Sequence, residues 1–199
     1  MVQKFFLDKR PHNGMTFSDY LEKMKTETEI SDLSNLSDQE REDLTLVKLN
    51  YQRFSRILRT YKVDEMLHDK IKNISSPQIW MIISEVSCGD SAQNIPYIAR
   101  IAEINPLIHL RIILRDSNLD IMDLYLTDGK SRSIPKLVAF DEQGNELFQW
   151  GARPREAQVL VNRLRNEGMP KEIFLEQLHL WYGRDRGKSL ESELKEIIS

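Results

Sequence analysis

The chain has 199 residues, of which 40% are hydrophobic and 30% charged, and its formal net charge at pH 7 is −3. This composition is typical of a soluble globular protein with one sizeable core, and the small negative charge favours neither nucleic acid nor membrane lipid as a partner. No stretch approaches the roughly 20 apolar residues of a membrane span, and the first residues lack the apolar block of an export signal, so we expect a cytoplasmic protein.

Residues 16–73 carry helical signals. Ser37 and Glu40 have the spacing of a capping box, and a stripe of apolar residues at steps of three and four follows them. The stripe consists of Leu44, Val47, Tyr51, Phe54, Leu58 and Tyr61. A second, short helix is expected from Asp64 to Lys72. The two helices together predict a helical arm that packs on the domain after it.

Four basic residues lie mostly off this apolar stripe: Arg53, Arg56, Arg59 and Lys62. Basic residues along one side of a helix can bind an anion or RNA, but they more often form a solvated face. We interpret them as a solvated face, with the anion or RNA patch as the alternative.

Strands and helices alternate after Pro77. The run QIWMIIS is apolar and β-branched, which is typical of a strand buried on both faces. The predicted order is β-α-β-α-β-β-α, with the last two strands joined through Gln143-Gly144-Asn145 as a hairpin. The other expected elements are a helix from Ala92 to Asn105, a strand from Leu107 to Arg115, a helix from Leu119 to Thr127, strands within 136–150, and a helix within 153–168.

Two amphipathic segments, 172–182 and 190–198, end the chain. They are too polar to fold alone, so we expect them to dock on the main domain. The predicted organisation is a helical region over 1–76, an α/β domain over 77–168 and a helical extension over 169–199. Trp80, Trp150 and Trp181 are interpreted as packing residues, and Arg153 and Arg155 as a surface pair at a helix start.

The turn Cys-Gly-Asp-Ser at 88–91 contains the only cysteine of the chain. A lone cysteine cannot form an intrachain disulfide, which agrees with a reducing compartment. The four histidines (His12, His68, His109 and His179) have no ligand spacing, so we expect neither a metal nor another cofactor.

The segments SCGDSAQN and SIPKLVAFDEQGNE, with the element order around them, resemble the thioredoxin family, in particular the branch whose active-site turn reads Cys-Gly-Asp. The resemblance covers about residues 77–168. It implies a thioredoxin-like α/β fold with a mixed sheet, flanked by the N-terminal helical arm and the C-terminal helical extension.

The resemblance also implies roles for single residues. Cys88 falls on the family's nucleophile and Ser91 on the position of the resolving cysteine, and both are expected to be catalytic. Gly89 and Asp90 fall on the family's turn and are expected to bind substrate.

Ile134-Pro135 matches the loop that faces the cysteine in this family. Its proline is cis there, and the main chain of the residue before it pairs with a bound partner. Ile134 and Pro135 are therefore expected to bind substrate.

Three positions depart from the family pattern. Ser87 stands where a tryptophan usually precedes the nucleophile, and we count it among the expected substrate-binding residues. Ile82 replaces a buried acid that accepts protons from the resolving thiol, and Ser91 removes that thiol. The last two departures agree, because without a second thiol the acid has nothing to deprotonate.

One thiol restricts the chemistry. A cysteine at a helix N-terminus is expected to have a lowered pKa, although the nearby Asp90 opposes this. Such a thiol can form a mixed disulfide but needs an external thiol to be released. The predicted function is monothiol oxidoreductase chemistry, or redox sensing, through Cys88 with protein or small-molecule thiols and mixed disulfides. The alternative is a non-catalytic protein-binding module, and the oligomeric state is left open.

Overall fold

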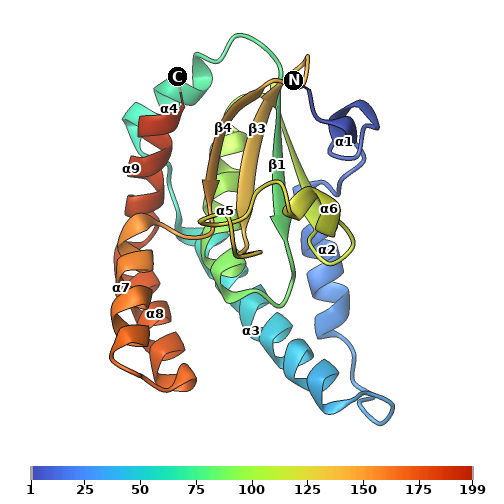
Figure 1. Cartoon of the computed structure of the whole chain (residues 1–199), viewed down its shortest axis with the longest axis vertical. Helices are drawn as coiled ribbons and strands as arrows, with labels where there is room; N and C mark the ends of the chain where they lie inside the picture. The colour runs from blue at the N-terminus through green and yellow to red at the C-terminus, as the bar shows by residue number, and fades with distance from the viewer. Residues whose placement is uncertain (1, 199) are drawn as a thin grey trace.

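A four-stranded mixed sheet forms the centre of the molecule in the computed structural model, which describes residues 2–198 (Figure 1). Its strands are β1 (Gln78–Ser84), β2 (Ile108–Leu114), β3 (Lys136–Asp141) and β4 (Glu146–Gly151), in the spatial order β2-β1-β3-β4. β1 is parallel to β2, whereas the pairs β1–β3 and β3–β4 are antiparallel. This is the predicted mixed sheet with a hairpin at its end, and the fold prediction is confirmed.

Alternate residues of β1 supply two hydrophobic clusters. Trp80 and Ile82 point into a large cluster with the helices α2 (Phe17–Thr28), α3 (Asp38–Thr60) and α5 (Gly89–Ala102). Met81 and Ile83 belong to a smaller cluster on the other face. All four are fully buried. Burial on both faces explains why the strand reads as a continuous apolar run rather than an alternating one.

The helical arm consists of α2 (Phe17–Thr28), α3 (Asp38–Thr60) and α4 (Glu65–Lys72). The capping box of Ser37 and Glu40 starts α3 as predicted, and Thr16 with Asp19 starts α2 in the same way. α3 packs against α2 and against α5 (Gly89–Ala102).

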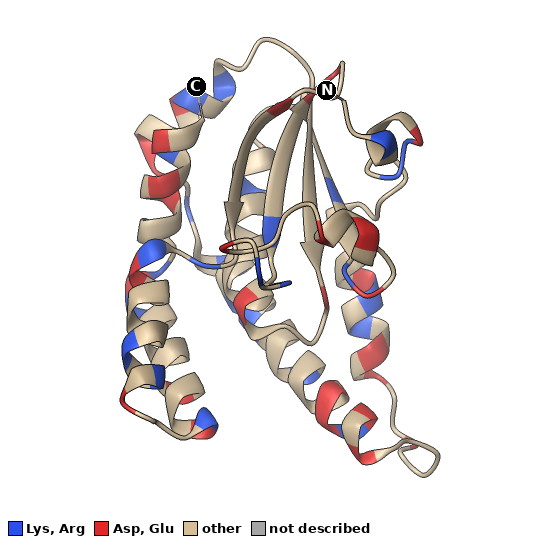
Figure 2. Cartoon of the chain, viewed as in Figure 1, with Lys and Arg blue, Asp and Glu red and all other residues tan. Residues whose placement is uncertain are grey.

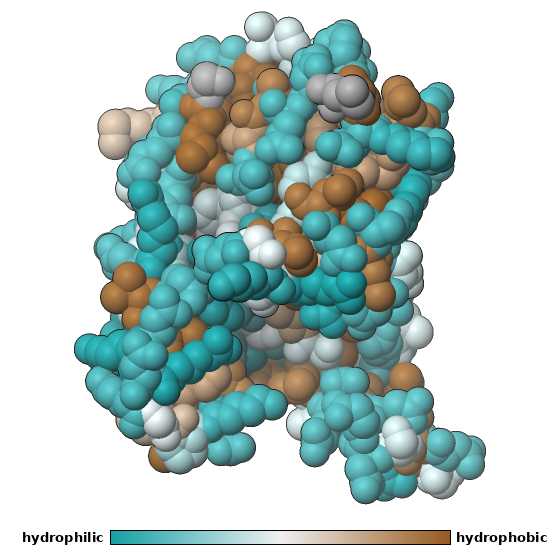
Figure 3. Space-filling model, viewed as in Figure 1, coloured by the Kyte–Doolittle hydropathy of each residue, from teal (hydrophilic) through white to brown (hydrophobic). Residues whose placement is uncertain are grey.

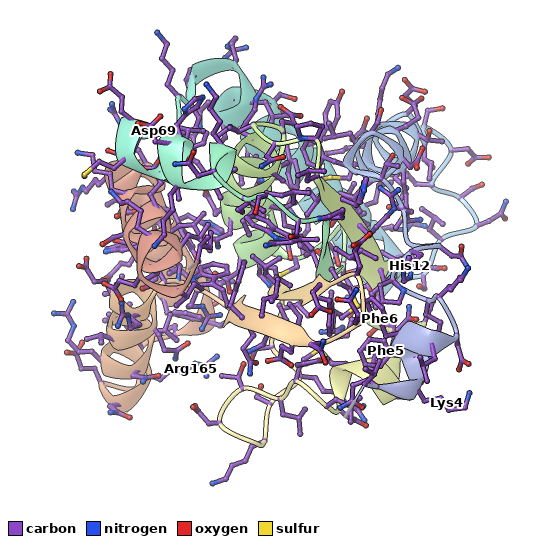
Figure 4. All side chains as sticks on the ribbon, turned by 90° about the horizontal axis from the view of Figure 1, so that it is seen from above. Lys4, Phe5, Phe6, His12, Asp69 and Arg165 are labelled. Atoms are coloured by element: carbon purple, nitrogen blue, oxygen red, sulfur yellow. The ribbon has the colours of Figure 1, made fainter. Side chains whose placement is uncertain are left out.

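A short N-terminal helix, α1 (Lys4–Leu7), was not predicted. Its Phe5 and Phe6 are buried beside Phe140 of β3, with ring centroids 6.0 and 5.2 Å from it. Figure 4 shows both rings turned towards the body of the molecule, with Lys4 pointing outwards. Two aromatic residues in a row give no helical periodicity, which is why only the tertiary contact reveals this element.

The helix after β2, α6 (Leu119–Met122), is shorter than expected, because it ends at Met122 rather than near Thr127. α7 (Arg155–Asn166) follows the hairpin, and the extension forms α8 (Lys171–Asp185) and α9 (Lys188–Ile197). Within residues 2–198, no helix is long and apolar enough to cross a membrane.

The extension docks on the rest of the chain. α8 packs against α7, and α9 lies beside α4 and β4 (Figure 1). Trp150 of β4 donates a hydrogen bond of 2.7 Å from its indole Nε1 to Glu193 of α9. Charged residues lie mainly on the outer faces of the helices, with few on the strands (Figure 2).

Candidate functional site

Cys88 lies in the loop between β1 and α5, and it is the residue that caps the N-terminus of α5. Its Sγ accepts a hydrogen bond from the backbone N–H of Ser91 and donates one to the carbonyl oxygen of Ile134, both at 3.4 Å. The Ile134–Pro135 peptide bond is cis, as the resemblance implied. The structure therefore brings Cys88, Ser91 and the Ile134-Pro135 loop together.

The hydroxyl of Ser91 belongs to a buried chain of polar groups. Ser84 Oγ donates to Ser91 Oγ at 2.8 Å, and Ser84 Oγ also lies 3.0 Å from the hydroxyl of Tyr20. Ser91 is 1% exposed and Ser84 and Tyr20 are fully buried. Ser91 thus connects the start of α5 to β1, and through Ser84 to α2, in addition to its contact with the sulfur.

The thiol is only partly exposed and packs against the smaller hydrophobic cluster. Burial raises the pKa of Cys88, and the negative charge of Asp90 raises it further. The hydrogen bonds from Ser91 act in the opposite direction but are the weaker effect. The expectation of a lowered pKa is therefore wrong: the helix N-terminus is present, but the apolar surroundings of the sulfur outweigh it.

Asp90 is held from two elements that are remote in the sequence. Tyr182 of α8 donates to Asp90 Oδ1 at 2.7 Å, and Arg153 forms an ion pair with Asp90 Oδ2. The side chains of Arg153 and Asp90 are 14% and 10% exposed. Arg153 is thus not the surface residue that its place at a helix start suggested, but a partner of the Cys88 turn. Arg155 does lie at the surface, where it pairs with Glu193 and Glu196.

Gly89 lies against His179 of α8. A Cβ at Gly89 would lie 3.0 Å from His179 Cε1 and 3.1 Å from Nε2, so even an alanine would press on the imidazole. Gln93 Nε2 is 3.3 Å from His179 Nδ1. Burial, with a smaller effect of the Arg53 charge, lowers the pKa of His179 to about 4, so the imidazole is neutral at pH 7.

Arg153, His179 and Tyr182 are the site residues that sequence reasoning missed. No spacing links them to the turn, because His179 and Tyr182 approach it only through the docking of α8, and Arg153 only through the return of the chain after β4. α8 therefore closes one side of the Cys88 turn.

The other side of the turn is open. A groove of about 600 Å³ lies between α2, α3 and the ends of β1 and β2, and Val86 and Ser87 line it directly before Cys88. Its lining residues are Lys23, Glu27, Ile30, Leu36, Glu40, Asp43, Leu44, Val47, Glu85, Val86, Ser87, Leu114, Arg115 and Asp116. Figure 3 shows that the lower part of the surface is hollowed between the side that carries α7 and α8 and the side that carries α2 and the start of α3 in Figure 1. Ser87, expected to bind substrate, opens onto this groove.

No cluster of three or more metal-ligating His, Cys, Asp or Glu side chains occurs among the described residues. The features of the site are the Cys88 thiol, the buried ion pair of Asp90 with Arg153, and the groove.

The sheet order, the thiol at the start of α5 and the cis-proline loop opposite it define a protein with a thioredoxin fold. A sequence profile of the thioredoxin family matches residues 37–165, which is more than half of the chain. The chain belongs to the thioredoxin family.

Two solved structures are similar in fold. A protein of unknown function from Pseudomonas aeruginosa has a TM-score of 0.61 at 18% identity, covering 94% of this chain and 93% of its own. An HIV epitope-scaffold has a TM-score of 0.60 at 17% identity, with 96% of each chain covered. Both similarities therefore extend over the helical arm and the C-terminal extension as well as the sheet. Among curated proteins, no sequence match was found.

Proposed function

We propose that this protein is a thioredoxin-fold binding module that holds an extended peptide in the groove beside Cys88. The observation that carries the proposal is the state of the thiol next to an open groove. Cys88 is kept as a neutral hydrogen-bond donor to the Ile134 carbonyl, while Ser87 and Val86 open directly onto the groove. A neutral thiol is a poor nucleophile, so the site is better suited to binding than to turnover.

The lining of the groove indicates the chemistry of the peptide. Its floor is apolar, formed by residues such as Leu44, Val47 and Leu114. Five carboxylates surround it against two cations: Glu27, Glu40, Asp43, Glu85 and Asp116 against Lys23 and Arg115. Both cations are already paired, Lys23 with Glu27 at 2.8 Å and Arg115 with Asp116 at 2.7 Å. A peptide with apolar side chains flanked by Lys or Arg complements this surface.

Monothiol exchange is the second candidate function. It is supported by the position of the sulfur, which is partly exposed at a helix N-terminus and faces the cis-proline loop. The Cys88 thiolate would attack a disulfide R–S–S–R′, form Cys88–S–S–R and release R′–S⁻, and a small thiol would then displace Cys88. The raised pKa of Cys88 works against this reaction at neutral pH.

The alkylation rate of Cys88 by iodoacetamide between pH 6 and pH 10 distinguishes the two functions. Because the thiolate is the reacting species, a binding module should react slowly at pH 7, with a rate that rises only above about pH 8.5. Unfolded protein in urea is the reference for an unhindered thiol. A midpoint near or below pH 7 would instead support monothiol exchange and reject the neutral thiol.

The groove itself is tested by selecting peptides from a display library on the immobilised protein. The enriched peptides are expected to combine apolar and basic residues. Asp43→Lys, which reverses a charge in the groove, should weaken a selected peptide about tenfold or more. The matched control Glu29→Lys, at an exposed position outside the groove, should bind as wild type. Cys88→Ser should also bind, whereas loss of binding in that variant would show that the peptide is held through the sulfur.

A further inference from the structure

A second pocket of about 600 Å³ lies between the C-terminal half of α3, α5 and the turn that joins α8 to α9. It is separate from the Cys88 groove. Tyr182 of α8 lines this pocket, and its hydroxyl donates a hydrogen bond to Asp90 in the Cys88 turn. α8 therefore contacts both the pocket and the Cys88 turn.

Four cationic side chains from two distant parts of the sequence line the pocket. Arg56 and Lys62 come from the end of α3 and the loop after it, and Arg186 and Lys188 come from the α8–α9 turn. All four are exposed, and none forms an ion pair within residues 2–198. By contrast, Arg153 beside the Cys88 turn and Arg155 at the start of α7 are paired with carboxylates.

A single carboxylate lines the pocket, and it already has partners. Glu191 is 8% exposed, and its Oε1 accepts hydrogen bonds from the Tyr61 hydroxyl at 2.5 Å and from the Asp64 backbone N–H at 3.0 Å. Asp185, in the same turn as Arg186, is likewise occupied, because it accepts bonds from Gly187 and Ser189. Neither carboxylate forms an ion pair with the four cations among residues 2–198, and the pocket lining carries four positive charges against the one negative charge of Glu191.

The turn that carries Arg186 and Lys188 has a defined shape. Arg186 and Gly187 both have left-handed backbone angles, with φ of 55° and 85°. A Cβ at Gly187 would lie 2.6 Å from the ring of Tyr97, so only glycine allows the turn to approach this ring. The carboxylate of Asp185 closes the turn. The backbone of this turn thus places Arg186 and Lys188 beside Tyr97, which also lines the pocket.

Arginine and lysine side chains around a concave site suit phosphate, since the guanidinium donates in a planar fork and the ammonium acts as a point charge. Tyr61 and Tyr97, whose ring centroids are 4.6 Å apart, add apolar surface beside the cations. The volume is that of a small-molecule site rather than a track for a polymer. We propose that this pocket binds a small molecule that carries phosphate groups.

The sequence alone favours a solvated helix face for Arg56 and Lys62, with an anion or RNA patch as the alternative. The structure divides the basic run of α3: Arg53 hydrogen bonds to Asn50 at 2.9 Å near the Cys88 turn, whereas Arg56 and Lys62 join the pocket.

Isothermal titration calorimetry with inorganic pyrophosphate and with adenosine 5′-monophosphate tests the proposal. The double substitution Arg186→Gln/Lys188→Gln should weaken the affinity about tenfold or more, because two charge-assisted contacts are lost. Arg56→Gln should weaken it as well, since it removes a cation from a different element. The matched controls are Arg184→Gln on α8 and Arg59→Gln on α3, which remove exposed cations outside the pocket and should stay within twofold of wild type.

All of these side chains are exposed, so thermal melts of each variant should coincide with wild type and separate binding from folding. Three results would overturn the proposal. They are no binding of either probe up to about 10 mM, an equal loss of affinity in the control variants, or a single-stranded oligonucleotide that binds through the same four residues while the small probes do not.

Discussion

The two sides of the Cys88 turn differ in how they are bounded. On one side, α8 presses His179 onto Gly89 and holds Asp90 through Tyr182, while Arg153 adds a buried ion pair. On the other side, the turn opens onto the groove between α2 and α3. Both sides are formed by helices outside the four-stranded sheet. The contacts between α8 and the turn are largely buried, whereas the groove between α2 and α3 is open to solvent.

This difference shows that the extension restricts the site rather than enlarging it. Val86 and Ser87, directly before Cys88, line the groove, whereas His179 of α8 lies against Gly89 on the opposite side. The turn residues Gly89 and Asp90 are accordingly explained by their contacts with α8, independently of any reaction at the sulfur.

Removing the charge of Asp90 should have the largest effect on the side of the turn that α8 covers. Asp90→Asn leaves the buried Arg153 without an anionic partner, and it should lower the free energy of unfolding by about 3 kcal/mol. Urea denaturation measures the loss. Glu176→Gln, at an exposed position on α8, is the control and should change little. Equal stability of both variants would mean that the ion pair does not hold the turn.

Because His179 is buried in its neutral form, the free energy of unfolding should depend on pH. The pKa of His179 is lowered from 6.5 to about 4 in the folded protein, mainly by burial, with Arg53 acting in the same direction and Asp90 against it. Between these values the unfolded chain binds more protons, so stability is full above pH 6.5 and is lost as the pH falls towards 4. The loss should reach about 2 kcal/mol relative to His179→Gln in parallel denaturation series. A constant difference between the two proteins would disprove it.

A substitution at Gly89 tests the contact between the turn and His179, with a smaller expected effect on the free energy of unfolding. Gly89→Ala should destabilise wild type by about 1 kcal/mol, because the new Cβ presses on His179. In the His179→Ala background the same change should instead stabilise by about 0.5 kcal/mol, since Gly89 has no positive φ and alanine restricts the unfolded chain. The sign reversal, measured in a double-mutant cycle, is the expected result. The same sign in both backgrounds would show that His179 is not what requires glycine.

Much of the fold was predictable because the signals are local. The apolar run 78–84, the capping box of Ser37 and Glu40 and the Gly144 turn each act within a few residues, and each element formed where they indicated. α1 could not be predicted, because Phe5 and Phe6 are stabilised by the distant Phe140.

The site was predictable only in part. The motif positions Cys88, Ser91 and Ile134-Pro135 came together, since a strand–turn–helix unit and one loop of the same sheet place them. The direction of the Cys88 pKa was not predictable, because it depends on how much apolar material surrounds the sulfur.

The sequence by itself determined the sheet, its helices and the position of the single thiol, because hydrophobic periodicity and turn chemistry act over short distances. Tertiary structure alone decided the state of that thiol, the pairing of Asp90 with Arg153 and Tyr182, and the gathering of four free cations in one pocket. The energies of charges and hydrogen bonds depend on neighbours that can be about a hundred residues away along the chain, and only the complete fold brings those neighbours together.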